Sequence, residues 1–459
     1  MSLNLITTTA SSPMIIKIVR RPFFDKWKEQ LSDPQLAWIK NNDFTANSVF
    51  AFPLPSYSGE ENQFIYLVGN DAQLWDWASL PANLAAGNYA LHEEELSSSD
   101  LYNATLAWSL ATYSYYRYKS SDISSPKLVW PKQCDRVAIE AAATSSHLVR
   151  DLINTPANDL GPEELANSAE ALAKEYGAEF SVIVGDDLIK QNYPSIHAVG
   201  RAHDRAPRLI DIRWGKTSDR KLTLVGKGVC FDTGGLDLKP SSGMELMKKD
   251  MGGAANVLGL TRMIMTAKLQ ICLRVLIPAV ENSVSANAMR PGDVIHSRKG
   301  ITIEIGNTDA EGRVILADAL CEAASENPEV IIDFATLTGA ARVALGTDLP
   351  ALFANDDGLA AELLTASKIT NDPLWRMPLW DDYNTKITGK IADITNSPSG
   401  RFGGAITAAL FLQRFIKPHI AWAHIDLIAW NLSPRPGRPE GGEAMGMRAV
   451  FKALEKRFG

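Results

Sequence analysis

Short apolar runs alternate with longer helical patterns over much of the chain. Strands are predicted at residues 180–184, 209–214, 222–225, 271–280, 301–305 and 330–334, and helices at 162–176, 252–268 and 314–324. Apolar strands interleaved with amphipathic helices are typical of a mostly parallel sheet that helices cover on both faces. This pattern predicts an α/β fold.

The chain has 459 residues, which is long enough for more than one domain. Residues 1–132 are expected to form a smaller N-terminal α/β domain that ends near a Ser-rich break at 120–126. Residues 133–156 are expected to form a connecting helix, which stops at Pro156 because proline cannot continue a helix. Residues 157–459 are expected to form a larger C-terminal domain with a mostly parallel central sheet flanked by helices.

Charge and cysteine content restrict the class of protein. The net charge of −7 argues against a surface that coats nucleic acid. The four cysteines form no C-x-x-C pair, so we expect reduced thiols and a cytoplasmic location. No secretory signal is recognised at the N-terminus, and the apolar runs are too short to span a bilayer.

The run 307–313 places two carboxylates and a guanidinium within a few residues. Asp309 and Glu311 are two residues apart, and Arg313 follows Gly312. Residues two apart do not share a helix face, so both carboxylates reach one cation only if the backbone turns. The run lies between a predicted strand and a predicted helix, where α/β proteins place ligand sites. A solvated acidic turn is the alternative reading of these residues alone.

A second group of ionisable residues follows the predicted strand 222–225. Lys227, Asp232 and Lys239 come after this strand, and Asp250 precedes the next helix. Singly, these residues are also typical of surface lysines, turns and helix caps. Jointly with the run 307–313, they are expected to meet at one sheet edge, where carboxylates and a neutral lysine amine suit two divalent cations. Oxygen-rich ligation favours Mn²⁺, Mg²⁺ or Zn²⁺ over copper.

The run 307–313 resembles the signature of the leucine aminopeptidase family, the cytosolic two-metal aminopeptidases that include bacterial aminopeptidase A. Further segments that resemble the family are 154–158, 225–235, 247–255, 335–340, 403–409 and 422–426. The resemblance covers about residues 145–430, while residues 442–448 match the family's ending only loosely. Residues 1–130 carry no motif that we can place. The resemblance implies that residues 157–459 form a catalytic di-metal peptidase domain.

The resemblance also implies roles for the metal ligands. Asp232 and Glu311 would bridge two metal ions, Mn²⁺ or Zn²⁺. Lys227 and Asp250 would complete the tighter metal site, and Asp309 would complete the more exchangeable one.

Four further residues and one catalytic pair follow from the same resemblance. Lys239 would hold the substrate carbonyl and its developing oxyanion. Arg313 would bind a bicarbonate ion that acts as a general base. The pocket for the first substrate side chain would be lined by Met247, Thr336, Leu337 and Gly339.

The expected function is therefore hydrolysis of the N-terminal peptide bond of peptides by a metal-activated water. The resemblance implies a preference for Leu-like or other unbranched or apolar N-terminal residues, and a homohexamer built as a dimer of trimers. One alternative is an additional DNA-binding or regulatory role of the N-terminal domain, supported only by the basic residues Lys17, Arg20, Arg21, Lys26 and Lys28. The acidic total favours a solvated face there instead. Another alternative is a different two-metal hydrolase, such as a phosphoesterase.

Overall fold

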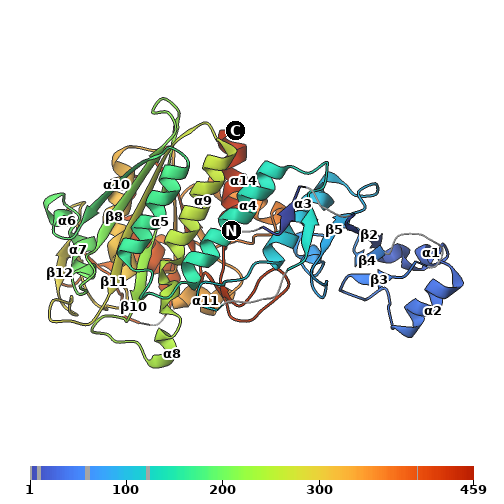
Figure 1. Ribbon diagram of the computed structural model, residues 1–459. Coiled ribbons are helices and arrows are strands. Elements are labelled where there is room, and N and C mark those ends of the chain that lie inside the picture. The colour runs from blue at the N-terminus through green and yellow to red at the C-terminus, as the bar shows by residue number, and fades with distance from the viewer. Residues whose placement is uncertain (1–2, 8–11, 57–62, 120–124, 401) are drawn as a thin grey trace. The chain divides into compact units, whose positions relative to one another are not determined.

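The structure is a computed structural model that describes residues 3–7, 12–56, 63–119, 125–400 and 402–459. The chain forms two compact units, each described here by itself (Figure 1). The first unit comprises Met1–His147 and Ser433–Glu440, and the second comprises Leu148–Leu432 and Gly441–Gly459. Most of the predicted Ser-rich break, residues 120–124, lies outside the described residues. The domain limits at residues 132 and 156 remain predictions from the sequence.

The first unit is built on a sheet of mostly parallel strands in the order β1-β6-β5-β2-β4-β3. The strands are β1 (Leu5–Ile6), β2 (Met14–Arg20), β3 (Phe52–Leu54), β4 (Gln63–Val68), β5 (Asn88–Leu91) and β6 (Lys127–Val129). The helices are η1 (Arg21–Phe23), α1 (Phe24–Lys28), α2 (Asp33–Asn41), η2 (Leu74–Trp77) and α3 (Ser98–Ala111). Trp27 and Phe44 pack with apolar residues of β2, β3 and β4 to form a core of its own. Helix α4 (Arg136–Asn154) carries the chain from this unit into the next.

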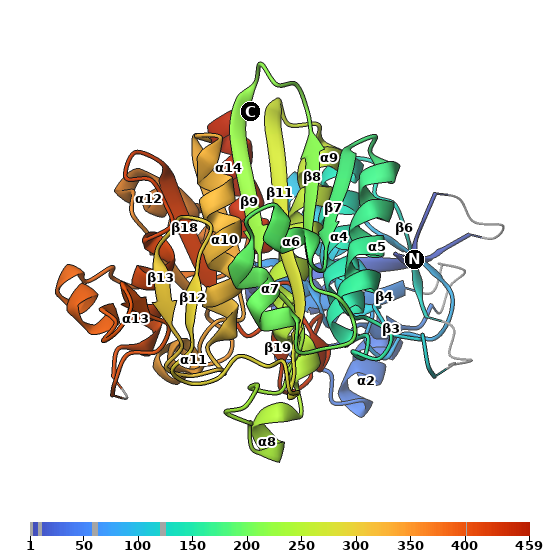
Figure 2. The same cartoon turned by 90° about the vertical axis from the view of Figure 1, so that its left-hand side faces the viewer.

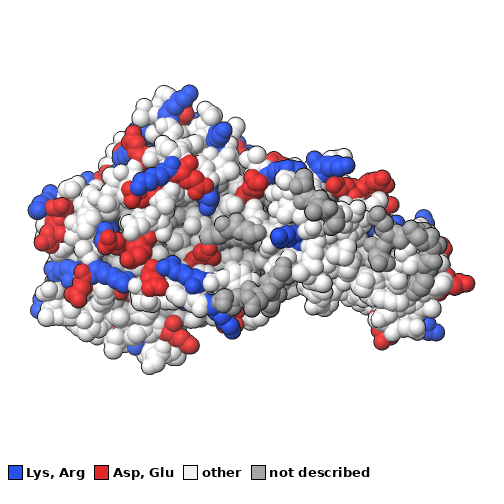
Figure 3. All heavy atoms as spheres, in the orientation of Figure 1, with Lys and Arg blue, Asp and Glu red and all other residues white. Residues whose placement is uncertain are grey.

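The basic residues considered for nucleic-acid binding lie in this first unit. Arg20 Nη2 lies 2.6 Å from Asp100 Oδ2, and Lys28 Nζ lies 2.8 Å from Asp25 Oδ1. On the face drawn in Figure 3, basic and acidic side chains are interspersed over the part of the chain that is described. Intramolecular pairing of this kind is typical of a solvated face, so the contacts do not support a DNA-binding role.

The second unit contains the predicted mostly parallel sheet. Its strands follow the order β16-β15-β18-β14-β9-β11-β8-β7, and β10 pairs with β11. The strands are β7 (Glu179–Val184), β8 (Arg208–Trp214), β9 (Arg220–Gly226), β10 (Gly228–Asp232), β11 (Ile271–Asn282), β14 (Val330–Ala335), β15 (Ala351–Ala354), β16 (Trp375–Arg376) and β18 (Ala421–Asp426). The central strands β18, β14, β9 and β11 are parallel neighbours, so their carboxyl ends lie at one edge of the sheet. The predicted α/β fold class is confirmed.

Helices cover both faces of this sheet (Figures 1 and 2). One face carries α5 (Pro162–Glu175), α9 (Gly252–Ala267), α12 (Asp357–Ile369) and α14 (Met447–Phe458), and the other carries α7 (Pro194–Gly200), α10 (Glu311–Ser325) and α13 (Gly404–Gln413). The shorter elements are α6 (Asp187–Lys190), α8 (Ser241–Met244), η3 (Met247–Met251), α11 (Gly339–Leu345), η4 (Asp381–Ile387), β19 (Trp430–Asn431) and β20 (Gly441–Gly442). Among the described residues, no helix is both long and apolar enough to cross a membrane.

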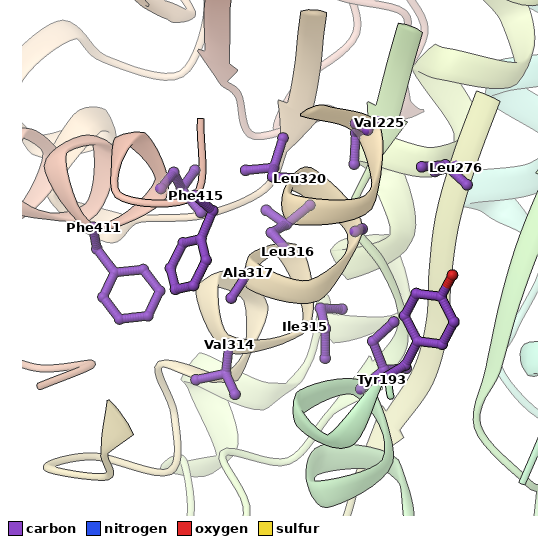
Figure 4. Packing of buried hydrophobic residues seen from close by; sticks show 14 of the residues in the cluster. Tyr193, Val225, Leu276, Val314, Ile315, Leu316, Ala317, Leu320, Phe411 and Phe415 are labelled. Carbon is purple, nitrogen blue, oxygen red and sulfur yellow. The ribbon is translucent and has the colours of Figure 1, made fainter. Parts of the chain in front are cut away.

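Helix α10 lies at the centre of the larger apolar core (Figure 4). Figure 4 shows Phe411 and Phe415 on one side of the helix, and Tyr193 and Leu276 on the other. Leu316 of α10 is fully buried in this cluster, and burying a leucine of this kind contributes about 1.5–3 kcal/mol. The packing fixes α10 against the sheet, and with it the end of the acidic run.

The strand predicted at residues 301–305 does not belong to the central sheet. β13 (Thr302–Glu304) pairs antiparallel with β12 (Val294–His296) and parallel with β17 (Ile394–Thr395), and the three form a small separate sheet. The expectation that the acidic run follows a strand of the central sheet is therefore wrong. A short apolar run does not specify its partner, and here pairing with the distant β17 places it.

Three buried side chains link β14 to β18 in the middle of the sheet. His424 Nδ1 lies 2.6 Å from Asp333 Oδ1, and Trp422 Nε1 donates to Asp333 Oδ2 at 2.7 Å. Burial lowers the pKa of His424, but the Asp333 carboxylate outweighs this and holds the pKa above its ordinary value of 6.5. His424 is therefore a core histidine held by an aspartate.

We predict that the wild type is more stable than Asp333→Asn at low pH. The difference in their free energies of unfolding should decrease as pH rises. The pKa of folded His424 lies above its unfolded value, so its stabilising effect is complete below the unfolded pKa and is lost as pH rises through the folded pKa. Urea unfolding measures the free energy of unfolding of both proteins at about pH 6 and about pH 9. Between these pH values, the difference between wild type and variant should decrease by about 1.4 kcal/mol for each unit by which folding raises the pKa of His424. A difference that grows with pH would contradict this assignment.

Candidate metal centre

The predicted site residues of the second unit gather at the carboxyl edge of the parallel strands. Lys227 follows β9, and Asp232 ends β10, where it pairs in register with Asn282 at the end of β11. Asp250 lies in η3 just before α9, and Glu311 is the first residue of α10. The structure thus brings together residues that lie between positions 227 and 311 of the sequence.

Lys227 is the buried centre of one half of this cluster. Its Nζ lies 2.7 Å from Asp250 Oδ2 and 3.0 Å from Glu311 Oε1. It also donates a hydrogen bond to the carbonyl oxygen of Thr336 at 3.0 Å. The side chain passes directly over Gly312, where a Cβ atom would lie 2.7 Å from Nζ. A glycine is needed there because any side chain would occupy the space of the lysine.

Lys239 joins the other two carboxylates. Its Nζ lies 2.8 Å from Asp232 Oδ2 and forms an ion pair with Asp309 Oδ1. The second oxygen of Asp232, Oδ1, accepts hydrogen bonds from Gly234 N and from Asn282 Nδ2, both at 2.8 Å. These two donors fix the carboxylate so that Oδ2 faces the cluster.

The donor atoms fit divalent cations. Asp232, Asp309 and Glu311 each offer a carboxylate oxygen, and these oxygens lie within 4.8 Å of one another. The oxygens Asp250 Oδ2, Asp309 Oδ1 and Glu311 Oε1 are buried, and each faces a lysine ammonium group. A set of carboxylates and one amine without thiolates suits Mn²⁺, Mg²⁺ or Zn²⁺.

The pKa values of the clustered carboxylates are shifted by burial and by neighbouring charges. Burial and the neighbouring Asp232 raise the pKa of Glu311 above its ordinary value, and the same two causes raise the pKa of Asp309. Burial alone would also raise the pKa of Asp250, but the Lys227 ammonium outweighs burial and holds it below its ordinary value. A cation placed among these carboxylates would stabilise their ionised forms.

The two lysines are held in their charged forms. Burial lowers the pKa of Lys227, yet Asp250 and Glu311 raise it further, so the net shift is upward. The pKa of Lys239 is raised in the same way by Asp232 and Asp309. Lys227 could bind a metal ion only after losing a proton, so metal binding at this position would release that proton.

Besides Lys227, Lys249 is a buried lysine of the cluster that the sequence pattern did not indicate. Its Nζ lies 3.9 Å from Asp250 Oδ1, and burial lowers the pKa of Lys249 to about 8. It follows Lys248 and precedes Asp250 in η3, so the sequence offered no reason to single it out from a charged turn. Its charge offsets part of the negative charge on Asp250.

Arg313 lies two residues after Glu311, on the first turn of α10. Its Nη1 donates to the carbonyl oxygen of Asn396 at 2.7 Å, while its Nε is buried and donates to no partner among the described residues. Burial lowers the pKa of Arg313 to about 10, so the guanidinium stays charged near neutral pH. A buried cation with a free donor is suited to an anion.

The residues expected to contact substrate lie on two segments beside the cluster. Thr336 is buried after β14 and donates from Oγ1 to the carbonyl oxygen of Asp250 at 2.8 Å. Leu337 is half-buried, Gly339 is exposed at the start of α11, and Met247 is buried at the start of η3. Asp426 holds this loop, because its Oδ1 accepts from the backbone N–H of Leu337 at 3.1 Å.

Three of the residues that organise the site were not foreseen from the sequence. Asn282 orients Asp232, Asp426 holds the loop after β14, and Asn396 contacts the acidic run. Asparagine and aspartate are also common in ordinary turns, so the residue type alone does not mark these positions as part of a site. Only the packing of distant segments identifies them.

The chain is similar in sequence to proteins of one family. Residues 147–451 match the "Cytosol aminopeptidase family, catalytic domain", and residues 14–131 match the "M17 aminopeptidase, N-terminal domain". A protein of Syntrophotalea carbinolica named "Probable cytosol aminopeptidase" is 45% identical over 326 residues. That alignment covers 70% of this chain and 65% of the relative, so the chain spans about two thirds of that curated relative's length.

Two solved structures are similar over almost the whole chain. The crystal structure of a cytosol aminopeptidase from Coxiella burnetii has a TM-score of 0.95 and 46% identity, and the match covers 100% of both chains. The bottromycin maturation enzyme BotP in complex with Mn has a TM-score of 0.86 and 30% identity, with 98% of this chain and 100% of that chain covered.

We predict that Gly312→Ala displaces Lys227 and weakens metal binding. Overpacking at a buried position should lower the free energy of unfolding by about 1–3 kcal/mol. Loss of correct ligand placement should lower Mn²⁺ affinity by about tenfold or more, measured by calorimetry. Gly243→Ala is the matched control, because its Cβ would meet Pro240 at an ordinary 3.5 Å. Equal Mn²⁺ affinity in both variants would contradict the prediction.

Proposed function

We propose that this chain, which belongs to the cytosol aminopeptidase family, is a metal-dependent aminopeptidase that hydrolyses the N-terminal peptide bond of peptides. The observation that carries the proposal is the buried cluster in which Lys227 and Lys239 lie among carboxylates of four residues. Burying this many charged groups costs free energy of folding, and such clusters are typical of functional sites.

The cluster would hold two divalent cations, Mn²⁺ or Zn²⁺, in each chain. In this proposal Asp232 and Glu311 would be shared by the two ions, Lys227 and Asp250 would complete the tighter site, and Asp309 would complete the exchangeable one. The closeness of the Asp232, Asp309 and Glu311 oxygens supports the bridging roles. BotP, a similar structure, is described in complex with Mn. When bound, the two ions supply a water whose pKa is low enough to furnish hydroxide near neutral pH.

Lys239 is proposed to stabilise the charge that develops on the substrate carbonyl oxygen. Its side chain is only partly exposed, and its pKa is raised, so it presents a fixed positive charge at the cluster. A preorganised cation in a site with little water stabilises a developing oxyanion strongly. Its two carboxylate partners position the ammonium group before substrate arrives.

Arg313 is proposed to anchor a bicarbonate ion that serves as general base. The buried Nε donor, which bonds to no described residue, and the retained charge of the guanidinium support this role. The anion would then lie one helical turn at most from Glu311, because both residues are on the first turn of α10. A base held there is placed to pass a proton to the leaving amine.

Restriction to the N-terminus would follow from the same cluster. Ions held there would favour a free substrate α-amine, which an internal peptide bond does not offer. Met247, Thr336, Leu337 and Gly339 are proposed to line the pocket for the first side chain, which would favour Leu-like or other unbranched or apolar residues. The buried thioether of Met247 supports an apolar pocket wall.

A cytoplasmic homohexamer, built as a dimer of trimers, is part of the proposal. Several large apolar side chains of the second unit are exposed: Val343 by 90%, Phe402 by 88% and Ile391 by 70%. Exposed apolar side chains of this kind are typical of surfaces that pair with another chain. Nucleic-acid binding is not proposed, since no contact of the described residues favours it.

The proposal predicts that dipeptides and aminoacyl anilides are cleaved only in the presence of divalent cations. Turnover of a panel with apolar, polar and charged first residues should be fastest with Leu or Met and should disappear after exhaustive chelation. Mn²⁺ or Zn²⁺ should restore it. Activity that survives chelation contradicts the metal-dependent mechanism. Hydrolysis of aryl phosphates without peptide cleavage would favour the phosphoesterase alternative.

Lys239→Met is predicted to separate binding of metal from turnover. Removing one preorganised charge from the oxyanion site should lower kcat/KM by about 10²–10³-fold. Mn²⁺ affinity measured by calorimetry should stay equal or rise, because one cation that competes for Asp232 and Asp309 is gone. Lys216→Met, at an exposed lysine after β8, serves as the control. A variant that loses metal and turnover together would refute a purely electrostatic role.

A further inference from the structure

One buried asparagine holds the backbone of the acidic run. Asn396 follows β17 and is fully buried. Its Oδ1 accepts from the N–H groups of Gly306 at 2.8 Å and Asn307 at 3.3 Å. Its Nδ2 donates to the carbonyl oxygens of Asn307 at 2.8 Å and Ala310 at 3.2 Å. A single side chain thus bonds four backbone groups of the turn 306–310.

The main chain of the same residue contacts both sides of the turn. Asn396 N donates to the carbonyl oxygen of Glu304 in β13 at 3.0 Å. Its carbonyl oxygen accepts from Arg313 Nη1 at 2.7 Å. Asn396 therefore contacts the strand before the turn, the turn itself and the first turn of α10 after it.

The turn needs such a partner because it is neither helix nor strand. Its backbone groups lack the regular partners of a helix or sheet, and leaving a buried group unsatisfied costs about 1–3 kcal/mol. The side-chain amide has both an acceptor and a donor end, which matches two N–H groups and two carbonyl oxygens. Aspartate has the same size but no donor, and leucine has neither.

We propose that Asn396 is a positioning residue that fixes the spacing between the Asp309 and Glu311 carboxylates and the Arg313 guanidinium. Its main-chain carbonyl contacts the Arg313 guanidinium, and its side chain acts on the two carboxylates through the turn. The consequence for metal binding rests on the proposed function, whereas the consequence for the backbone does not. Outer groups of this kind typically change metal affinity by about 10–100-fold when replaced.

The test compares Asn396→Ala and Asn396→Asp with a matched control, Asn355→Ala. Asn355 is also an amide clamp: its Nδ2 donates to Ile420 O at 2.9 Å, and its Oδ1 accepts from Trp422 N at 2.7 Å. It lies at the amino end of β18, while the site lies at the carboxyl end. The full chain of each variant is examined by hydrogen exchange without added metal and by calorimetric titration with Mn²⁺.

In both Asn396 variants we expect the amides of Gly306 and Asn307 to exchange at least about tenfold faster. We expect the weaker Mn²⁺ step to lose about 10–100-fold in affinity, while the tighter step changes less. Asn355→Ala should lose stability without either effect. Asn396→Asp is as large as the wild-type side chain, so wild-type behaviour of this variant would overturn the proposal.

Equal loss of Mn²⁺ affinity in Asn355→Ala would also overturn it, because the effect would then be one of general stability. If an Asn396 variant does not fold, the remaining Asn396 variant decides the question. If the wild type binds no Mn²⁺, the proposed function fails, and hydrogen exchange alone decides the positioning role.

Discussion

The structure depends on a balance of buried charge at one edge of a parallel sheet. Four carboxylates lie close together there, and two like charges about 4 Å apart repel by about 4 kcal/mol at an effective dielectric constant near 20. Lys227 and Lys239 offset this repulsion by lying between pairs of carboxylates. Divalent cations would offset the same repulsion with more positive charge. The clustered carboxylates therefore explain both the positions of the lysines and the proposed metal binding.

The scaffold around the cluster provides rigid placement. Parallel strands bring Lys227, Asp232 and Asp426 to one edge, and the packed helix α10 brings Glu311 to the same place. Close approach is possible because Gly312 leaves room for a lysine side chain. The buried amides of Asn282 and Asn396 then orient the Asp232 carboxylate and the turn 306–310.

The sequence predicted the α/β fold, and it predicted that the charged residues meet at one sheet edge. Both predictions were possible because strand patterns, and acidic residues at strand ends, are local signals. Asp232 and Asp250 were found in this way, together with the carboxylates of the run 307–313. The sequence pattern placed β13 in the wrong sheet, because the strands with which a strand pairs are not encoded in its own residues. Lys249 and Asn396 were missed because their roles arise only where distant segments meet.

Titration of the metal-free protein with Mn²⁺ in two buffers of different ionisation enthalpy tests the proposed metal centre. Calorimetry of this kind gives the number of ions bound and the number of protons released. We expect two Mn²⁺ ions per chain and release of at least one proton, since Lys227 must become neutral to bind metal. Binding of fewer than two ions, or of two ions without proton release, would contradict it.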